Sequence, residues 1–163
     1  DWTGSGHLQL ENGVEYSEAF LANKIIQKLK NEGKGEVAQN FSFKIFQEKS
    51  KITGNVIAIA PTGSGKTEAS LLCASDKKEW ERIIYLLPTR VTSNAIFDRL
   101  REYFGDEYVA LIHSSARLYQ KEQIDNNYDQ KTYFRDKSFF RNINVCTIDQ
   151  ILTQGFNLGF WEV

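Results

Sequence analysis

The chain has 163 residues, a formal net charge of −1 and an ordinary balance of apolar and charged side chains, so one soluble domain with a substantial core is expected. No apolar run approaches the length of a membrane span, and the lack of a basic excess gives nucleic-acid binding no support beyond what a local groove can supply. No secretory signal is visible, and Cys73 and Cys146 lie far apart in apolar contexts, which is typical of reduced thiols in a cytoplasmic protein.

The first part of the chain is expected to hold a linker and two helices. Residues 1–15 are Gly-rich and polar, as linkers are. From 17 to 30, apolar and charged residues alternate at helical spacing, with Ser17 as a candidate N-cap. The apolar face of this helix would consist of Phe20, Leu21, Ile25 and Leu29. A second short helix is predicted at 41–49.

The sequence Ala-Pro-Thr-Gly-Ser-Gly-Lys-Thr at 60–67 is the strongest motif of the chain. It follows an apolar run at 56–60, expected to be a buried strand, and precedes a helical pattern at 66–75. This order is that of the phosphate-binding loop of nucleoside triphosphatases. Its glycines let backbone N–H groups turn toward phosphate oxygens, and the helix N-terminus adds its positive dipole end. Because Ala60 replaces the first glycine, a plain Gly-rich turn is the alternative.

The residue types of this loop predict an ATP site. Lys66 can reach the β- and γ-phosphates, and Thr67 can hold Mg²⁺ through its hydroxyl, so these two are the candidate catalytic residues. The other predicted nucleotide contacts of the loop are Pro61, Thr62, Gly63, Ser64 and Gly65.

After the loop, apolar strands alternate with helices. The expected elements are buried strands at 82–87, 109–113 and 142–148 and helices at 89–104 and from Asp149 onward. This alternation predicts an α/β fold, with a parallel sheet covered by helices on both faces. The polar stretch at 117–141 is expected to hold one helix and a mobile connection. The phosphate loop and residues 88–90, 113–115 and 147–150 all follow strands, so we expect them at one edge of the sheet, where ligands bind.

With those segments in place, the chain resembles the first RecA-like domain of superfamily 2 helicases. Pro-Thr-Arg at 88–90 resembles motif Ia, and Thr-Ile-Asp-Gln at 147–150 lies where motif Ib is expected. The resemblance implies that Thr89, Arg90, Ser114 and Thr147 contact single-stranded DNA. It also gives Gln47, nineteen residues before Lys66, the place of the Q-motif glutamine that reads adenine.

Longer segments resemble the CRISPR-associated helicase–nuclease of type I systems. They are APTGSGKTEA at 60–69, YLLPTRVTSNA at 85–95, His-Ser at 113–114 and TIDQIL at 147–152. This resemblance covers about residues 41–160. It implies recruitment by the RNA-guided surveillance complex, degradation of the displaced DNA strand, and an HD nuclease domain before the helicase. The sequence DWTGS at 1–5 resembles the last segment of that nuclease domain.

Each implied role has a plainer structural alternative. Thr89 can be an N-cap, Arg90 an ordinary helix-start residue, and Ser114 a cap of the next helix. Thr147 can be a β-branched strand residue, and Asp149 is most simply an N-cap. His113 is expected to be packed or hydrogen-bonded rather than a metal ligand, because no second ligand lies at metal-site spacing.

The chain departs from the family in two respects. No apolar strand ending in Asp-Glu follows Thr67, although that pair orders Mg²⁺ and activates water in the family. The HD metal ligands are missing, since the only histidines are His7 and His113, and so is the second RecA-like domain with its arginine fingers. We therefore expect a fragment: a linker at 1–15, then residues 16–163 as the N-terminal part of the first RecA-like domain, inactive or very slow alone.

Other functions stay open. The chain could belong to another superfamily 2 translocase or an RNA helicase. A P-loop phosphotransferase would need an Arg-rich lid, for which 117–141 is the only candidate. A non-catalytic nucleotide-binding module would agree with the missing Asp-Glu pair.

Overall fold

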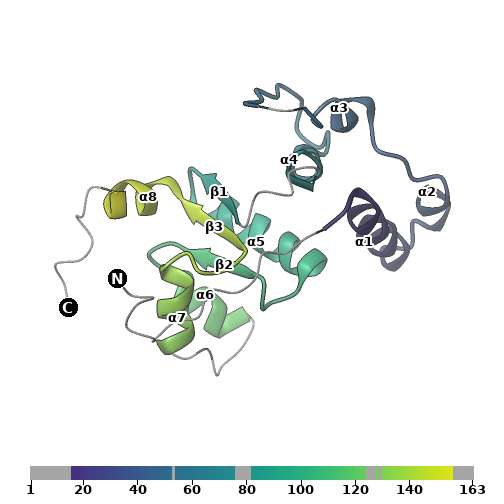
Figure 1. The fold of residues 1–163 in the computed structure, drawn as a ribbon. Coiled ribbons are helices and arrows are strands. Elements are labelled where there is room, and N and C mark those ends of the chain that lie inside the picture. The colour runs from purple at the N-terminus through teal and green to yellow at the C-terminus, as the bar shows by residue number, and fades with distance from the viewer. Residues whose placement is uncertain (1–15, 53, 76–81, 124–127, 129, 156–163) are drawn as a thin grey trace. The chain divides into compact units, whose positions relative to one another are not determined.

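The computed structural model describes residues 16–52, 54–75, 82–123, 128 and 130–155 (Figure 1). They fall into two compact units, divided between residues 80 and 81. We call the described residues 16–75 the loop unit and the described residues 82–155 the sheet unit. The expected linker at 1–15 lies outside the described residues. No helix in the described part of the chain is both long enough and apolar enough to cross a membrane.

All the regular secondary structure in the described residues of the loop unit is helical. Its helices are α1 (Glu18–Asn31), α2 (Gly35–Gln39), α3 (Ile45–Glu48) and α4 (Lys66–Ser75). The predictions of α1 and α4 are confirmed. The helix predicted at 41–49 is limited to α3, and α2 was not predicted.

Helix α1 begins where its sequence signal indicates. The Ser17 hydroxyl accepts a hydrogen bond from the backbone N–H of Phe20 at 3.1 Å, which satisfies one free donor of the first turn. Glu18 lies in that turn, and Lys28 and Lys30 lie in the last one, so their charges complement the helix dipole. On the predicted apolar face, Leu21 and Ile25 are buried.

The prediction of a buried strand at 56–60 is wrong. These residues have no regular structure, and the side chains of Ile57 and Ile59 are 91% and 93% exposed. An apolar run becomes a strand only when a neighbouring strand pairs with its backbone groups. Within the described residues of the loop unit there is no strand that could pair with 56–60.

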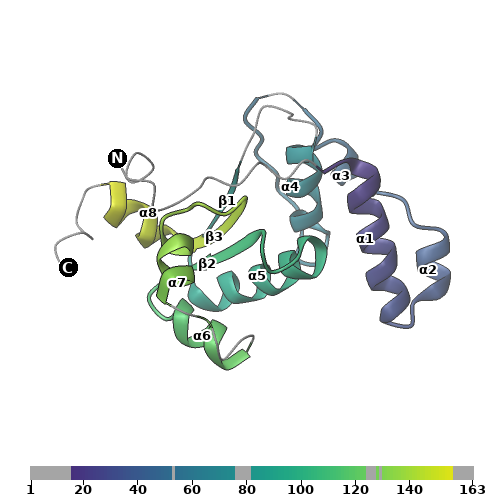
Figure 2. The same cartoon turned by 60° about the horizontal axis from the view of Figure 1, so that its bottom comes forward.

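The sheet unit is α/β, as predicted. It consists of β1 (Ile83–Leu87), α5 (Arg90–Phe104), β2 (Val109–Ile112), α6 (Ala116–Gln123), α7 (Gln130–Lys137), β3 (Ile143–Thr147) and α8 (Ile148–Gly155). The strands form a parallel sheet in the order β1-β3-β2 (Figure 2). The central strand is therefore the last in sequence, and the carboxyl ends of all three strands share one edge.

Both faces of β2 and β3 are buried. On one face, a cluster packs against Phe139, which follows α7, and against Ile151 of α8. The cluster consists of Ala110, Ile112 and Cys146. On the other face, the alternate residues of both strands are buried as well, and α5 contacts all three strands. Strand β1 differs from the prediction of a buried strand, because Ile84 and Leu86 are 48% and 47% exposed. These two residues alternate along the strand, so one face of β1 is exposed, whereas β2, which is also an edge strand among the described residues, is buried on both faces.

Local signals define the ends of α5. The Thr89 hydroxyl caps its first turn by accepting from the backbone N–H of Thr92 at 3.3 Å. At the other end, Gly105 has a φ of +98°, and a Cβ there would lie 2.8 Å from the Glu107 carboxylate. The predicted cap is confirmed, and the helix predicted to end at residue 104 ends at this left-handed glycine.

The stretch at 117–141 contains two helices, α6 and α7, where one was predicted. A buried ionic network holds the segment to the sheet. Asp136 pairs with Arg141 at 2.8 Å and accepts a hydrogen bond from the Tyr128 hydroxyl at 2.6 Å, and Arg141 also donates to the Glu107 carbonyl. Some of the charged side chains of this stretch are therefore buried and paired with one another.

Candidate functional site

The phosphate loop has a backbone that glycine makes possible. Gly63 and Gly65 have φ values of +78° and +91°, in the left-handed region. A Cβ on Gly65 would lie only 2.4 Å from the Gln47 amide nitrogen. Helix α4 begins directly after the loop, at Lys66, so its free N–H groups face the loop.

Lys66 is held by the loop itself. Its ammonium donates to the carbonyls of Ala60 at 2.8 Å and Pro61 at 3.0 Å, and the side chain is exposed. The Ser64 hydroxyl is buried and has no hydrogen-bond partner among the described residues. An available cation, an unsatisfied hydroxyl and a helix N-terminus together fit the phosphates of a nucleotide. Thr67 lies half-buried in the first turn of α4.

Gln47 supports the loop from α3. The residue is 5% exposed, and its amide nitrogen donates to the Gly65 carbonyl at 3.1 Å. Its amide oxygen accepts from the Lys44 backbone N–H at 2.9 Å, and the Lys44 ammonium donates to the Ser64 carbonyl at 3.2 Å. The predicted contact of Gln47 with adenine stays a prediction. Sequence reasoning missed Lys44, which belongs to no motif and would have been found only by its place three residues before Gln47.

At the carboxyl edge of the sheet, Arg90, Asn94, His113 and Ser115 are joined by hydrogen bonds. The Arg90 guanidinium donates to the Ser115 hydroxyl at 3.3 Å. The His113 Nδ1 accepts from the Ser115 backbone N–H at 3.2 Å, and its Nε2 lies 2.8 Å from the side-chain amide oxygen of Asn94. This pattern requires the neutral tautomer with the proton on Nε2. His113 is thus hydrogen-bonded, as predicted.

Electrostatics favour the same neutral form. Burial lowers the pKa of His113, and the positive charge of Arg90 lowers it further, against a smaller opposing effect of Asp149. The imidazole therefore joins α5 to the end of β2 without adding a charge to the edge. Arg90 and Thr89 are exposed there, which leaves them accessible to a ligand.

Thr147 is only 3% exposed. Hydrogen bonds from the side chains of Thr147 and Gln150 lower the pKa of Asp149. The interpretation of Asp149 as an N-cap is wrong, because α8 begins at Ile148 and Asp149 lies inside its first turn. The role of Thr147 as a phosphate contact stays a prediction, as do those of Thr89, Arg90 and Ser114.

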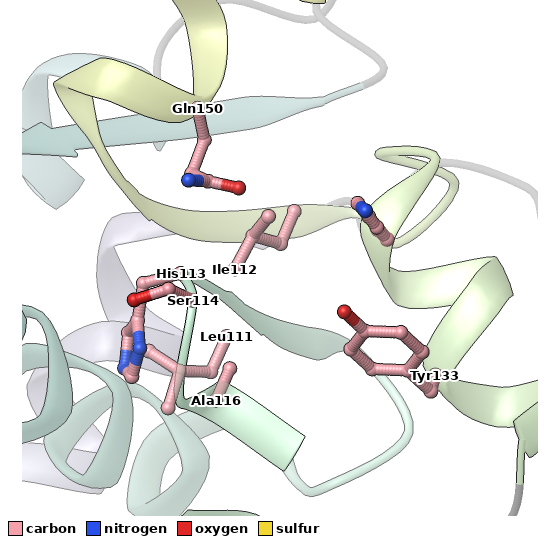
Figure 3. A pocket seen from close by; sticks show the side chains of 8 residues that line it. Leu111, Ile112, His113, Ser114, Ala116, Tyr133 and Gln150 are labelled. Carbon is pink, nitrogen blue, oxygen red and sulfur yellow. The ribbon is translucent and has the colours of Figure 1, made fainter. Parts of the chain in front are cut away.

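A cavity of about 290 Å³ opens beside this edge (Figure 3). Its lining residues come from the end of β2, from α6, from α7 and from α8: Leu111, Ile112, His113, Ser114, Ala116, Tyr133, Lys137 and Gln150. The structure thus brings Ser114 together with Gln150, and Arg90 with Ser115. Of the segments expected at one edge, the three after β1, β2 and β3 belong to the sheet unit, and the phosphate loop belongs to the loop unit.

The two cysteines of the chain are free thiols. Cys146 is buried in the sheet, and burial raises the pKa of its thiol to about 11, so it is an inert core residue. Cys73 is only half-buried. No cluster of three or more histidine, cysteine or acidic side chains suited to a metal occurs within the described residues.

Comparison with known sequences gives a consistent result. The profile of the DEAD/DEAH box helicase family matches residues 38–153. The chain is 36% identical over 121 residues to the putative CRISPR-associated nuclease/helicase Cas3 of Methanocaldococcus jannaschii, covering 69% of this chain and 16% of that protein. It is 46% identical over 72 residues to Cas3 of Methanothermobacter thermautotrophicus, covering 42% and 8%.

The CRISPR-associated endonuclease/helicase Cas3 of Escherichia coli is 31% identical over 121 residues, covering 61% of this chain and 14% of that protein. The match with each of these relatives thus spans no more than 16% of the relative's length. No solved structure matches the chain.

Proposed function

This chain belongs to the DEAD/DEAH box helicase family, and we propose that it is the ATP-binding lobe of an ATP-dependent DNA helicase that acts in CRISPR interference. The family binds ATP. The observation that supports the proposal most strongly is the phosphate loop, in which Gly63 and Gly65 are left-handed and the Lys66 ammonium is exposed beside an unsatisfied Ser64 hydroxyl.

In this proposal, the side chains of the loop unit divide the work of holding Mg²⁺ and ATP. Lys66 exchanges its two loop carbonyls for β- and γ-phosphate oxygens, and the Thr67 hydroxyl binds Mg²⁺. Thr62, Gly63, Ser64 and Gly65 supply backbone N–H donors, and Pro61, which has no N–H, contacts the nucleotide without donating. Gln47 keeps the loop in its left-handed form through the Gly65 carbonyl, and its contact with adenine is part of the proposal.

The sheet unit supplies the path of single-stranded DNA. Thr89 and Arg90 at the start of α5, Ser114 after β2 and Thr147 at the end of β3 contact the backbone phosphates. Such contacts carry no sequence information, which suits a protein that moves along a strand. The hydrogen bonds that join Arg90, Ser115, His113 and Asn94 hold two of these segments in a fixed relation.

The CRISPR context rests on the similarity to proteins named Cas3. We place residues 16–163 in the first RecA-like domain, preceded by a linker at 1–15, in a cytoplasmic protein that also has a second RecA-like domain and an HD nuclease domain. The proposed partner is the RNA-guided surveillance complex, and the proposed outcome is degradation of foreign DNA.

The proposal is tested by the binding of Mg·ATP to this chain, followed by isothermal titration calorimetry. We expect Lys66→Ala to weaken binding at least tenfold, or about 1.4 kcal/mol, because it removes the cation at the phosphates. Lys30→Ala, an exposed lysine in the last turn of α1, is the matched control and should bind as the wild type does. Equal affinities of the two variants, or no binding by the wild type, would refute the site.

A further inference from the structure

The cavity beside the carboxyl edge of the sheet has a function that the helicase motifs do not assign. We propose that it receives one base of the bound single strand, with Lys137 next to the phosphate of that nucleotide. The inference rests on the proposed function, because it takes the strand to lie along the edge marked by Arg90 and Ser114.

The floor of the cavity holds a small apolar area within a mostly polar lining. Leu111, Ile112 and Ala116 belong to the lining and are at most 3% exposed. A base presents a flat ring together with a hydrogen-bonding edge, and a mixed lining of this kind can accommodate both. The volume of about 290 Å³ lies at the lower limit of ligand pockets, which begin near 300 Å³, so the occupant is a small one.

Polar groups surround this floor at positions suited to the edge of a base. The Tyr133 hydroxyl points into the cavity from α7, and the Gln150 side chain extends toward the cavity from α8 (Figure 3). The Gln150 amide nitrogen donates to the Asp149 carboxylate at 2.6 Å, which leaves the amide oxygen and a second N–H for a base. The Tyr133 hydroxyl both donates and accepts. This pair can bind the edge of more than one base, as a translocating protein requires.

The charges around the cavity suit a nucleotide as well. Lys137 lines it, and the Arg117 guanidinium lies over the Tyr133 ring, 5.9 Å from its centroid. His113 belongs to the lining and is neutral, and the nearby Asp149 carboxylate is already bound by Gln150. Aromatic side chains beside cations are the usual means of binding single strands without sequence preference.

The test compares two ligands on three proteins. Fluorescence anisotropy gives the affinity of this chain for labelled oligothymidylate and for an abasic oligomer of equal length, in which no register can place a base in the cavity. We expect the wild type to prefer oligothymidylate about tenfold, and Tyr133→Leu to remove this preference. Phe134→Leu, a 51% exposed neighbour on α7 that does not line the cavity, is the matched control and should keep the preference.

A second pair of variants tests the phosphate contact at the rim and does not disturb the floor. Lys137→Gln should lower the slope of log affinity against log salt by about 0.7, which corresponds to one phosphate contact. Lys121→Gln, an exposed lysine of α6 outside the cavity, should leave the slope unchanged.

The outcomes separate this inference from the proposed function. If the wild type binds neither oligomer, the proposed nucleic-acid edge itself fails. If it binds both equally, or if Tyr133→Leu keeps the preference while circular dichroism shows a native fold, the base site fails and the edge remains. A preference lost in Tyr133→Leu and kept in Phe134→Leu supports the site.

Discussion

Among the individual residues, His113 shows how the sheet edge is organised. It is 4% exposed and uses both ring nitrogens, one toward Asn94 of α5 and one toward the backbone of Ser115. Arg90 donates to the Ser115 hydroxyl. His113 therefore acts as a positioning residue, because it holds Ser115, which accepts from Arg90, in a fixed relation to Asn94 of α5.

The lowered pKa of His113 predicts how stability depends on pH. Above pH 6.5, the ordinary pKa of histidine, the side chain is neutral in both the folded and the unfolded chain. Below it, the unfolded chain takes up a proton that the folded chain resists, so the free energy of unfolding falls as the pH falls. Urea unfolding between pH 8 and pH 5 measures this.

The matched variant for this experiment is His113→Gln, which keeps a donor but cannot be protonated in this range. It should flatten the part of the pH profile between 6.5 and 5. The other histidine, His7, is present in both proteins, and Asp149, whose pKa is lowered, affects stability only at more acidic pH. Identical profiles for the two proteins would show that His113 ionises as freely in the folded chain as in the unfolded one.

At the scale of elements, the loop between residue 60 and α4 depends on contacts that a motif cannot show. The pattern predicted the glycines of the loop, but not that the Gln47 side chain lies against Gly65 and donates to its carbonyl. The position requires glycine for two reasons, because φ is +91° and because a Cβ would meet Gln47 at 2.4 Å.

Gly65→Ala should therefore destabilise the loop unit by about 1–3 kcal/mol, the usual cost of a left-handed non-glycine residue, as measured by urea unfolding. Gly35→Ala is the matched control, since a Cβ there meets nothing within 4 Å and φ lies outside the left-handed region. In a Gln47→Ala background the cost should be smaller, because only the backbone strain remains. If Gly65→Ala is as stable as Gly35→Ala, the contact described for Gln47 is absent.

The elements predicted correctly are those with strong local signals. The caps Ser17 and Thr89 and the stop at Gly105 lie within one turn of the helices they end. The strand predicted at 56–60 depends instead on a pairing partner, and the burial of β1 depends on what packs over each of its faces; an apolar run carries no information about either. The division of 117–141 into two helices depends on Asp136 and Arg141, which meet only in the folded chain.

For the whole molecule, the α/β class and the parallel sheet follow from alternating apolar strands and helices, and the structure confirms both. The helicase motifs pointed to the family, which the family comparison confirms. The cavity beside the edge could not be predicted, because Tyr133 and Lys137 come from a stretch without a motif and reach Ile112 and Gln150 only through the packing of α7 and α8.

Above all, we propose that this chain, which carries a phosphate loop, also binds single-stranded nucleic acid through the start of α5. The most direct measurement is the affinity of this chain for labelled oligothymidylate, by fluorescence anisotropy at several salt concentrations. We expect Arg90→Ala to bind several-fold more weakly, with a salt slope lower by about 0.7, and Lys121→Ala to bind as the wild type does. No binding by the wild type, or an Arg90→Ala variant with unchanged affinity and slope, would contradict this proposal.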